Sequence, residues 1–173
     1  MSPPPYALGV DTDVTRLRDA DHLLRELVNG LGLPGDLVGC THLVRNGGRP
    51  RLALSLATGE RAALATARER LVARGHSVTD GAWDDSGRAV LYPGAADLTG
   101  TLTVAQVLAR SAIDRVRVLG TRDAPDPSVP LVTREFVRPQ WEGGALVLAA
   151  MPAVGGTLVP FEDPDPTPCC ADH

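Results

Sequence analysis

The amino-acid sequence predicts an α+β fold: a single domain with a mostly antiparallel sheet and helices on one face. Three segments show apolar residues at the three- and four-residue steps of an amphipathic helix. Short β-prone runs are separated by glycine-rich turns of the kind that close β-hairpins. A doubly wound parallel sheet is disfavoured because strands and helices do not alternate singly. A chain of 173 residues suits one ordinary domain better than two.

The N-terminal half is predicted to have the order αββαββ. Residues 1–10 begin with prolines and are expected to be a flexible arm. The first helix is expected over 13–31, because Gly32 and the following Pro34 end its apolar pattern. The next elements are expected to be strands at 37–45 and 51–57, a helix at 59–74, and strands at 76–83 and 88–92. Each pair of strands is predicted to form a hairpin, one around 46–49 and the other around 84–87.

The C-terminal half is predicted to contain one helix, one alternating strand and a β-meander. Thr103 and Gln106 have the spacing of a capping box, which predicts a helix over 103–113. The alternation after it predicts a strand at 114–119. The meander is expected to have strands at 131–138, 145–151 and 157–161, separated by paired glycines. The domain is therefore predicted to cover 11–161, with residues 162–173 as an extended tail.

Composition excludes several classes of function. All 17 basic residues are arginine, so Schiff-base chemistry and the lysine of a Walker A loop are excluded. A net charge of −4 argues against nucleic acid as a partner, because no basic excess is available to displace counterions. No apolar run approaches the ~20 residues of a membrane span. The first residues lack the pattern of a secretory signal, so a cytoplasmic location and no membrane partner are expected.

The tail carries the most unusual chemistry in the sequence. Its prolines at 164, 166 and 168 favour an extended conformation. Cys169, Cys170 and His173 follow them, and thiolates and imidazole are donors that soft and borderline metal ions prefer. The sequence therefore predicts a small soluble cytoplasmic protein with an exposed thiol pair that binds a thiophilic metal ion or is redox-active.

Cys40 and His42 are the second set of candidate metal ligands. Two residues apart in a predicted strand, they share one face and can ligate the same ion if the tail folds back onto them. The alternative is structural: Cys40 as a small core residue and His42 as a histidine with its hydrogen bonds satisfied. The Cys169-Cys170 pair resembles, in those two residues alone, the C-terminal tail of mercuric reductases. That resemblance implies capture of a soft ion.

An anion-binding site is the basis of the alternative function. Arg117, Arg134 and Arg138 lie on predicted strands of the C-terminal half, and convergent guanidinium groups bind carboxylate or phosphate. The protein would then be a non-catalytic binding or accessory module for a small anionic ligand or a partner protein. The competing interpretation is a solvated sheet face, with these arginines paired to carboxylates such as Glu135.

A small enzyme of unrecognised type is the third hypothesis. The sequence has no GxSxG, HExxH or CxxC motif. The histidines at 22, 42, 76 and 173 are scattered, so spacing predicts no Ser-His-Asp set. A pocket that holds Cys40 or His42 beside a carboxylate would favour this hypothesis.

Overall fold

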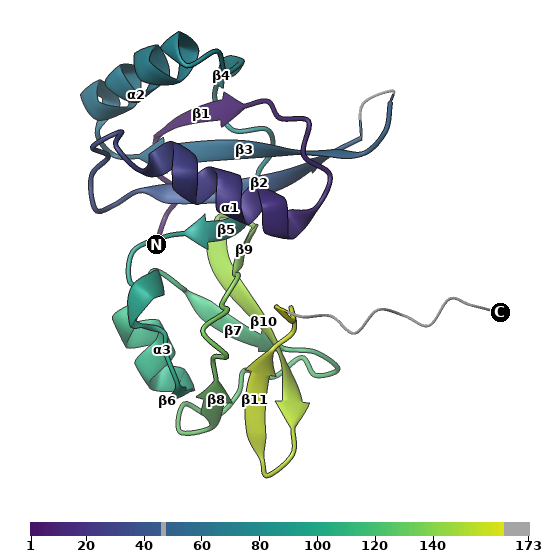
Figure 1. The fold of residues 1–173 in the computed structure, drawn as a ribbon. Helices are drawn as coiled ribbons and strands as arrows, with labels where there is room; N and C mark the ends of the chain where they lie inside the picture. The colour runs from purple at the N-terminus through teal and green to yellow at the C-terminus, as the bar shows by residue number, and fades with distance from the viewer. Residues whose placement is uncertain (46–47, 165–173) are drawn as a thin grey trace, which may run out of the picture.

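The computed structural model describes residues 1–45 and 48–164, and it confirms the α+β class (Figure 1). Within this part of the chain, an 11-stranded, mostly antiparallel sheet is accompanied by three α-helices. The helices are α1 (Leu17–Val28), α2 (Arg61–Ala73) and α3 (Val104–Arg110), with a 3-10 turn, η1, at Ala95–Asp97. The strands are β1 (Tyr6–Val10), β2 (Val38–Val44), β3 (Arg51–Thr58), β4 (Val78–Asp80), β5 (Arg88–Leu91), β6 (Thr101–Thr103), β7 (Arg115–Val118), β8 (Pro130–Val132), β9 (Gln140–Glu142), β10 (Ala145–Ala153) and β11 (Thr157–Pro160). No helix of the described residues has the length and apolarity needed to cross a membrane.

The N-terminal half is a βαββαβ unit with the strand order β4-β1-β3-β2. This topology is that of ferredoxin-like folds. One face of the sheet packs against α1 and α2 (Figure 1). Leu24 of α1 and Leu71 of α2 are fully buried in one cluster with Leu54 and Leu56 of β3. The alternation of β3 therefore directs its leucines at the helices and leaves its small residues on the other face.

The C-terminal half surrounds a second core. β10 pairs with β9 and β11 in antiparallel fashion and with β7 in parallel. Leu131, Leu146 and Leu148 are buried here together with Val107 of α3. β5 joins the halves into one sheet, because it pairs with β2 on one side and with β9 through Arg88 and Gln140 on the other. The boundaries of a single domain at 11–161 stay a prediction.

The expected flexible arm is wrong for its second half. Tyr6–Val10 forms β1, which lies between β3 and β4 and buries Leu8 and Val10. The sequence pattern did not indicate this strand, because it has only five residues and follows directly after prolines. The expected hairpin of 76–83 with 88–92 is also wrong, because β4 pairs with β1 whereas β5 pairs with β2. The added strand β1 takes the partner that the sequence pattern assigned to β5.

The expected meander is confirmed in part. The strands expected at 145–151 and 157–161 form the hairpin of β10 and β11 around Gly155-Gly156, whereas the strand before Gly143-Gly144 is β9, which the sequence did not predict. Only the start of the strand expected at 131–138 is formed: β8 ends at Val132. It pairs with β6 and, in parallel, with β11. Arg134 and Glu135 then adopt left-handed backbone angles, with φ of 54° and 52°. The capping box of Thr103 and Gln106 at the start of α3 is confirmed.

Candidate functional site

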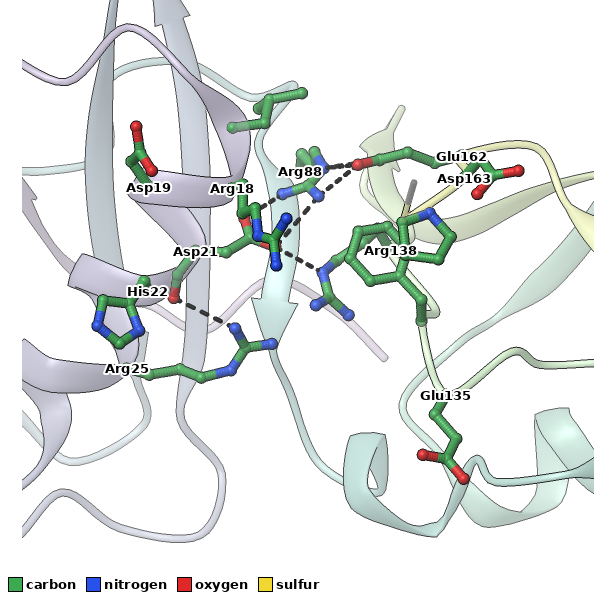
Figure 2. Close-up of a pocket in the computed structure, with 13 residues that line it drawn as sticks. Arg18, Asp19, Asp21, His22, Arg25, Arg88, Glu135, Arg138, Glu162 and Asp163 are labelled. Atoms are coloured by element: carbon green, nitrogen blue, oxygen red, sulfur yellow. Dashed lines mark hydrogen bonds and ion pairs between the residues drawn. The ribbon is translucent and has the colours of Figure 1, made fainter. Parts of the chain in front are cut away.

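A cavity of about 900 Å³ lies between α1 and the C-terminal half, and we call it the arginine cleft (Figure 2). Four segments far apart in the sequence form it. They contribute Leu17, Arg18, Asp19, Asp21, His22 and Arg25 from α1, Arg88 from β5, Glu135, Phe136 and Arg138 from the segment after β8, and Glu162, Asp163 and Pro164 after β11.

Asp21 holds two buried arginines in the cleft. Its carboxylate accepts hydrogen bonds from Arg88 Nη1 at 2.5 Å and Nη2 at 3.2 Å, and from Arg138 Nε at 2.9 Å. Asp21 is 4% exposed and Arg88 is 6% exposed. Burial opposes the charge on Arg88, but the neighbouring carboxylates of Glu162 and Asp21 outweigh it and raise the pKa of Arg88. Burial lowers the pKa of Arg138, and Asp21 offsets only part of that effect.

Glu162 occupies the opposite edge of the Arg88 guanidinium. Arg88 Nε donates to Glu162 Oε2 at 2.7 Å and to Oε1 at 2.9 Å, and Nη2 also contacts Oε1. Figure 2 shows Arg88 between the two carboxylates, Asp21 on one side and Glu162 on the other. Glu162 belongs to the segment that follows the last strand, and its side chain is 29% exposed. The Nε edge of the Arg88 guanidinium therefore binds a carboxylate. That carboxylate comes from a partly exposed side chain in the segment after β11.

Phe136 adds an aromatic surface beside the arginines. The guanidinium carbon of Arg138 lies 4.1 Å from the centre of its ring, and that of Arg88 lies 5.9 Å away. Both distances are within the range of a cation–π interaction. The left-handed turn at Arg134 and Glu135 directly precedes Phe136, and the Phe136 amide donates to the Thr133 carbonyl across this turn.

The rim of the cleft carries exposed arginine and histidine side chains of α1. Arg18, His22 and Arg25 fall at helical spacing and line the same cavity. Arg25 makes one long contact, 3.4 Å, with the Asp21 carbonyl, and His22 Nε2 lies 3.1 Å from Glu26. Within the described residues, Arg18 has no hydrogen bond or ion pair. The guanidinium groups of Arg18 and Arg25 are available to an anion that enters from solvent.

The three arginines predicted from the sequence contact three different carboxylates. Arg138 contacts Asp21 in the cleft, Arg117 donates to Glu142 at 2.9 Å, and Arg134 donates to Asp163 at 3.0 Å. Of the three, the cleft lining includes Arg138 alone. Sequence reasoning missed Arg88, since an arginine at the start of an apolar strand looks like any exposed strand end.

Cys40 and His42 share one face of β2, as their spacing predicts, and both are buried. No group of three or more His, Cys, Asp or Glu side chains in the described segments could hold a metal ion. Burial raises the pKa of the Cys40 thiol to about 12. The thiol is therefore neutral at physiological pH. Cys169, Cys170 and His173 lie outside the described residues, so their metal-binding role stays a prediction.

His42 has two side-chain partners that the spacing of residues in the sequence did not indicate. Its Nδ1 lies 3.0 Å from Asp84 Oδ1, and its Nε2 lies 2.7 Å from Ser55 Oγ. A Ser-His-Asp set is thus assembled from three separate segments. Spacing alone carried no signal for it, because β2 and β3 bring His42 and Ser55 together only through their register.

The comparisons with protein-family models, curated proteins and solved structures found no match.

Proposed function

We propose that the protein is a binding module whose arginine cleft takes a small ligand with carboxylate or phosphate groups. The observation that carries this proposal is the seating of Glu162 on Arg88. Nε and Nη2 of Arg88 both donate to the Glu162 carboxylate, in the bidentate geometry that arginine uses to recognise such groups. A ligand anion has the same chemistry as the side chain that lies there.

The charge of the cleft supports exchange of Glu162 for a ligand. Its lining contains Arg18, Arg25, Arg88 and Arg138, against five carboxylates. Two of these carboxylates, Glu162 and Asp163, belong to the segment after β11. Without Glu162, four arginines face four carboxylates, so the lining has no net charge to repel an incoming anion. An anion that replaces Glu162 restores the balance around Arg88.

Phe136 and the rim define the kind of ligand. The ring lies against Arg138 and offers an apolar surface to a flat group. Arg18 and Arg25 offer a second anchoring point nearer to solvent. We therefore expect a ligand with at least two negative charges and a planar or apolar part between them.

The rim arginines provide the first test. Citrate, phthalate and pyrophosphate are titrated calorimetrically into the full chain, into the R18Q/R25Q variant and into an R110Q/R122Q control that removes two exposed arginines elsewhere. Loss of charge-assisted contacts worth roughly 1.5–3 kcal/mol each should weaken binding about tenfold or more in R18Q/R25Q and little in the control. Equal affinities in the two double variants, or no binding to the wild type below millimolar concentration, would remove the rim from the proposal.

A separate proposal concerns the predicted thiol site of Cys169, Cys170 and His173. Zn²⁺, Cu⁺ and As(III) are titrated into the reduced full chain and into a C169S/C170S variant, with C40S as the control. Binding that is lost in C169S/C170S and kept in C40S supports the metal role. A shortened chain for the same purpose should end at Pro164 rather than before Glu162, because Glu162 is bonded to Arg88. Equal binding by all forms would assign the metal to other groups.

A further inference from the structure

The Ser55, His42 and Asp84 side chains form one hydrogen-bonded chain outside the arginine cleft. His42 lies on β2, Ser55 lies on β3, and Asp84 lies on the loop between β4 and β5. Ser55 Oγ is 2.7 Å from His42 Nε2, and Asp84 Oδ1 is 3.0 Å from His42 Nδ1. The two imidazole nitrogens therefore have different partners, a hydroxyl on one side and a carboxylate on the other.

The partners fix which nitrogen carries the proton. Burial acts to raise the pKa of Asp84, but hydrogen bonds from His42 and Ser86 outweigh it and hold that pKa below its ordinary value. An ionised carboxylate only accepts, so Nδ1 of the neutral ring carries the hydrogen and Nε2 accepts from the Ser55 hydroxyl. The hydrogen bonds thus run in the same direction as in a Ser-His-Asp triad, where serine is the nucleophile, histidine is the general base and the carboxylate orients the histidine.

The hydroxyl of this chain faces a second cavity, of about 430 Å³, on the sheet face opposite the helices. His42 and Ser55 are 3% and 4% exposed, yet both line this cavity. Apolar residues make up much of the remaining lining, among them Pro3, Val38, Ala57 and Trp141. The small residues of β1 and β3 leave this room in front of Ser55. A short apolar group fits such a lining.

Gly87 and Trp83 lie near this hydrogen-bonded chain. Gly87 packs against the imidazole so closely that a Cβ there would be 2.7 Å from His42 Cε1. The indole nitrogen of Trp83 is buried without a hydrogen-bond partner in the described residues. A Cβ on Gly9, the β1 residue paired with Ser55, would lie 3.0 Å from that nitrogen. This N–H lies on the Ser55 side of the sheet, although Trp83 itself is not among the residues that line the cavity.

Cys40 is the competing nucleophile in this cavity. It is paired across the strands with Ser55 and lines the same space. Its neutral thiol is a poor nucleophile, and no histidine nitrogen contacts it among the hydrogen bonds of the described chain. The chemistry therefore belongs to the hydroxyl.

We propose that Ser55, His42 and Asp84 form an acyl-transfer centre for small neutral esters with a short apolar acyl group. Ser55 Oγ attacks the ester carbonyl carbon while its proton passes to His42 Nε2. The bond to the leaving oxygen breaks, and the alcohol departs with that proton. Water then attacks the acyl-serine with His42 as base, which releases the carboxylic acid and restores Ser55. Asp84 acts as a positioning residue, and with Asp85 at the same cavity it disfavours anionic esters.

Covalent labelling tests this proposal on the full chain. The C169S/C170S background removes two thiols that would react with ester probes. A fluorophosphonate is added, the adduct is located by peptide mass spectrometry, and hydrolysis of p-nitrophenyl acetate and butyrate is followed in parallel. We expect one adduct, on Ser55, and loss of labelling and of most ester hydrolysis in S55A but not in the S128A control, which removes an exposed loop serine.

The Asp84 variants separate positioning from folding. D84N should slow labelling by roughly 100-fold or more, because the imidazole loses its oriented tautomer, and D84E should restore part of the rate. Thermal melting of each variant shows whether it folds. A wild-type protein without an adduct, an adduct on another residue, or S55A hydrolysis at the wild-type rate would overturn the proposal and leave His42 as a buried, hydrogen-bonded core residue.

Discussion

Arg88 connects the two halves of the molecule through side-chain contacts. Its guanidinium bonds to Asp21 of α1 and to Glu162 after β11, and it lies where β5 meets β9. Of the candidate residues in this network, the sequence indicated only Arg138. A buried ion pair between residues 67 apart leaves no trace in local spacing. The sequence also placed Cys40 and His42 on a shared face, because alternation along a strand is a local property.

Removal of the Asp21 charge should destabilise the fold strongly. D21N leaves Arg88 and Arg138 buried with one carboxylate fewer, and breaking a buried pair in this way costs about 3–5 kcal/mol. Urea unfolding measures the free energy, with E26Q, an exposed carboxylate of the same helix, as the control. A loss below 1 kcal/mol in D21N would show that the network contributes little to stability.

Cys40 should be inert in the native protein. Burial raises the pKa of its thiol to about 12, so the neutral form persists at any pH where the protein is normally handled. In a C169S/C170S variant, we expect a disulfide reagent at pH 8 to label no thiol until denaturant is added. Rapid labelling without denaturant would mean that the cavity beside Ser55 opens readily.

At the scale of elements, the sequence predicted best what neighbouring residues decide. The capping box of α3, helix α2 and the strands β2 and β3 lie where the local pattern placed them. The pairing of β4 with β1 and of β8 with β11 was missed, because strand partners are chosen by packing across the whole sheet. Strand β1 was missed because five residues after prolines are too few to show the alternation of a β-strand.

Gly94 is a position where the absence of a side chain lets two elements approach closely. It lies at the start of η1 with φ of 79°, and a Cβ there would be 2.0 Å from the carbonyl oxygen of Arg110 at the end of α3. Gly94→Ala should therefore cost clearly more than Gly144→Ala, whose left-handed angle alone costs about 1–2 kcal/mol because its Cβ meets nothing. Equal losses in chemical unfolding would place the α3 terminus farther from η1.

At the scale of the molecule, two cores share one sheet. The cluster under α1 and α2 belongs to the N-terminal half, and the cluster around β10 belongs mostly to the C-terminal half. Composition and length predicted one α+β chain but gave no sign of a cleft between two halves. That cleft follows from where Arg88, Asp21 and Glu162 meet, which is a property of tertiary structure alone.

We expect the two halves to unfold together. Trp83 reports on the N-terminal half and Trp141, which packs against the second core, on the C-terminal half. Fluorescence of W83F and W141F variants follows each half separately in urea. Coincident midpoints are expected because β5 and the Arg88 network link the cores. Two separate unfolding transitions would mean that residues 11–161 form two domains and not the single domain predicted.

The most direct measurement of the binding proposal is the affinity of the E162Q variant for a small dianion. If Glu162 occupies the edge of Arg88 that the ligand needs, its neutralisation weakens an internal competitor, and citrate or pyrophosphate should bind about tenfold or more tightly than to the wild type. The matched control is E135Q, which neutralises a carboxylate of the same cleft that makes no hydrogen bond or ion pair with Arg88 within the described residues. Tighter binding to E162Q with little change in E135Q is the predicted result. Unchanged or weaker binding to E162Q would contradict the account, because Glu162 would then be a structural partner of Arg88 and not the occupant of a ligand site.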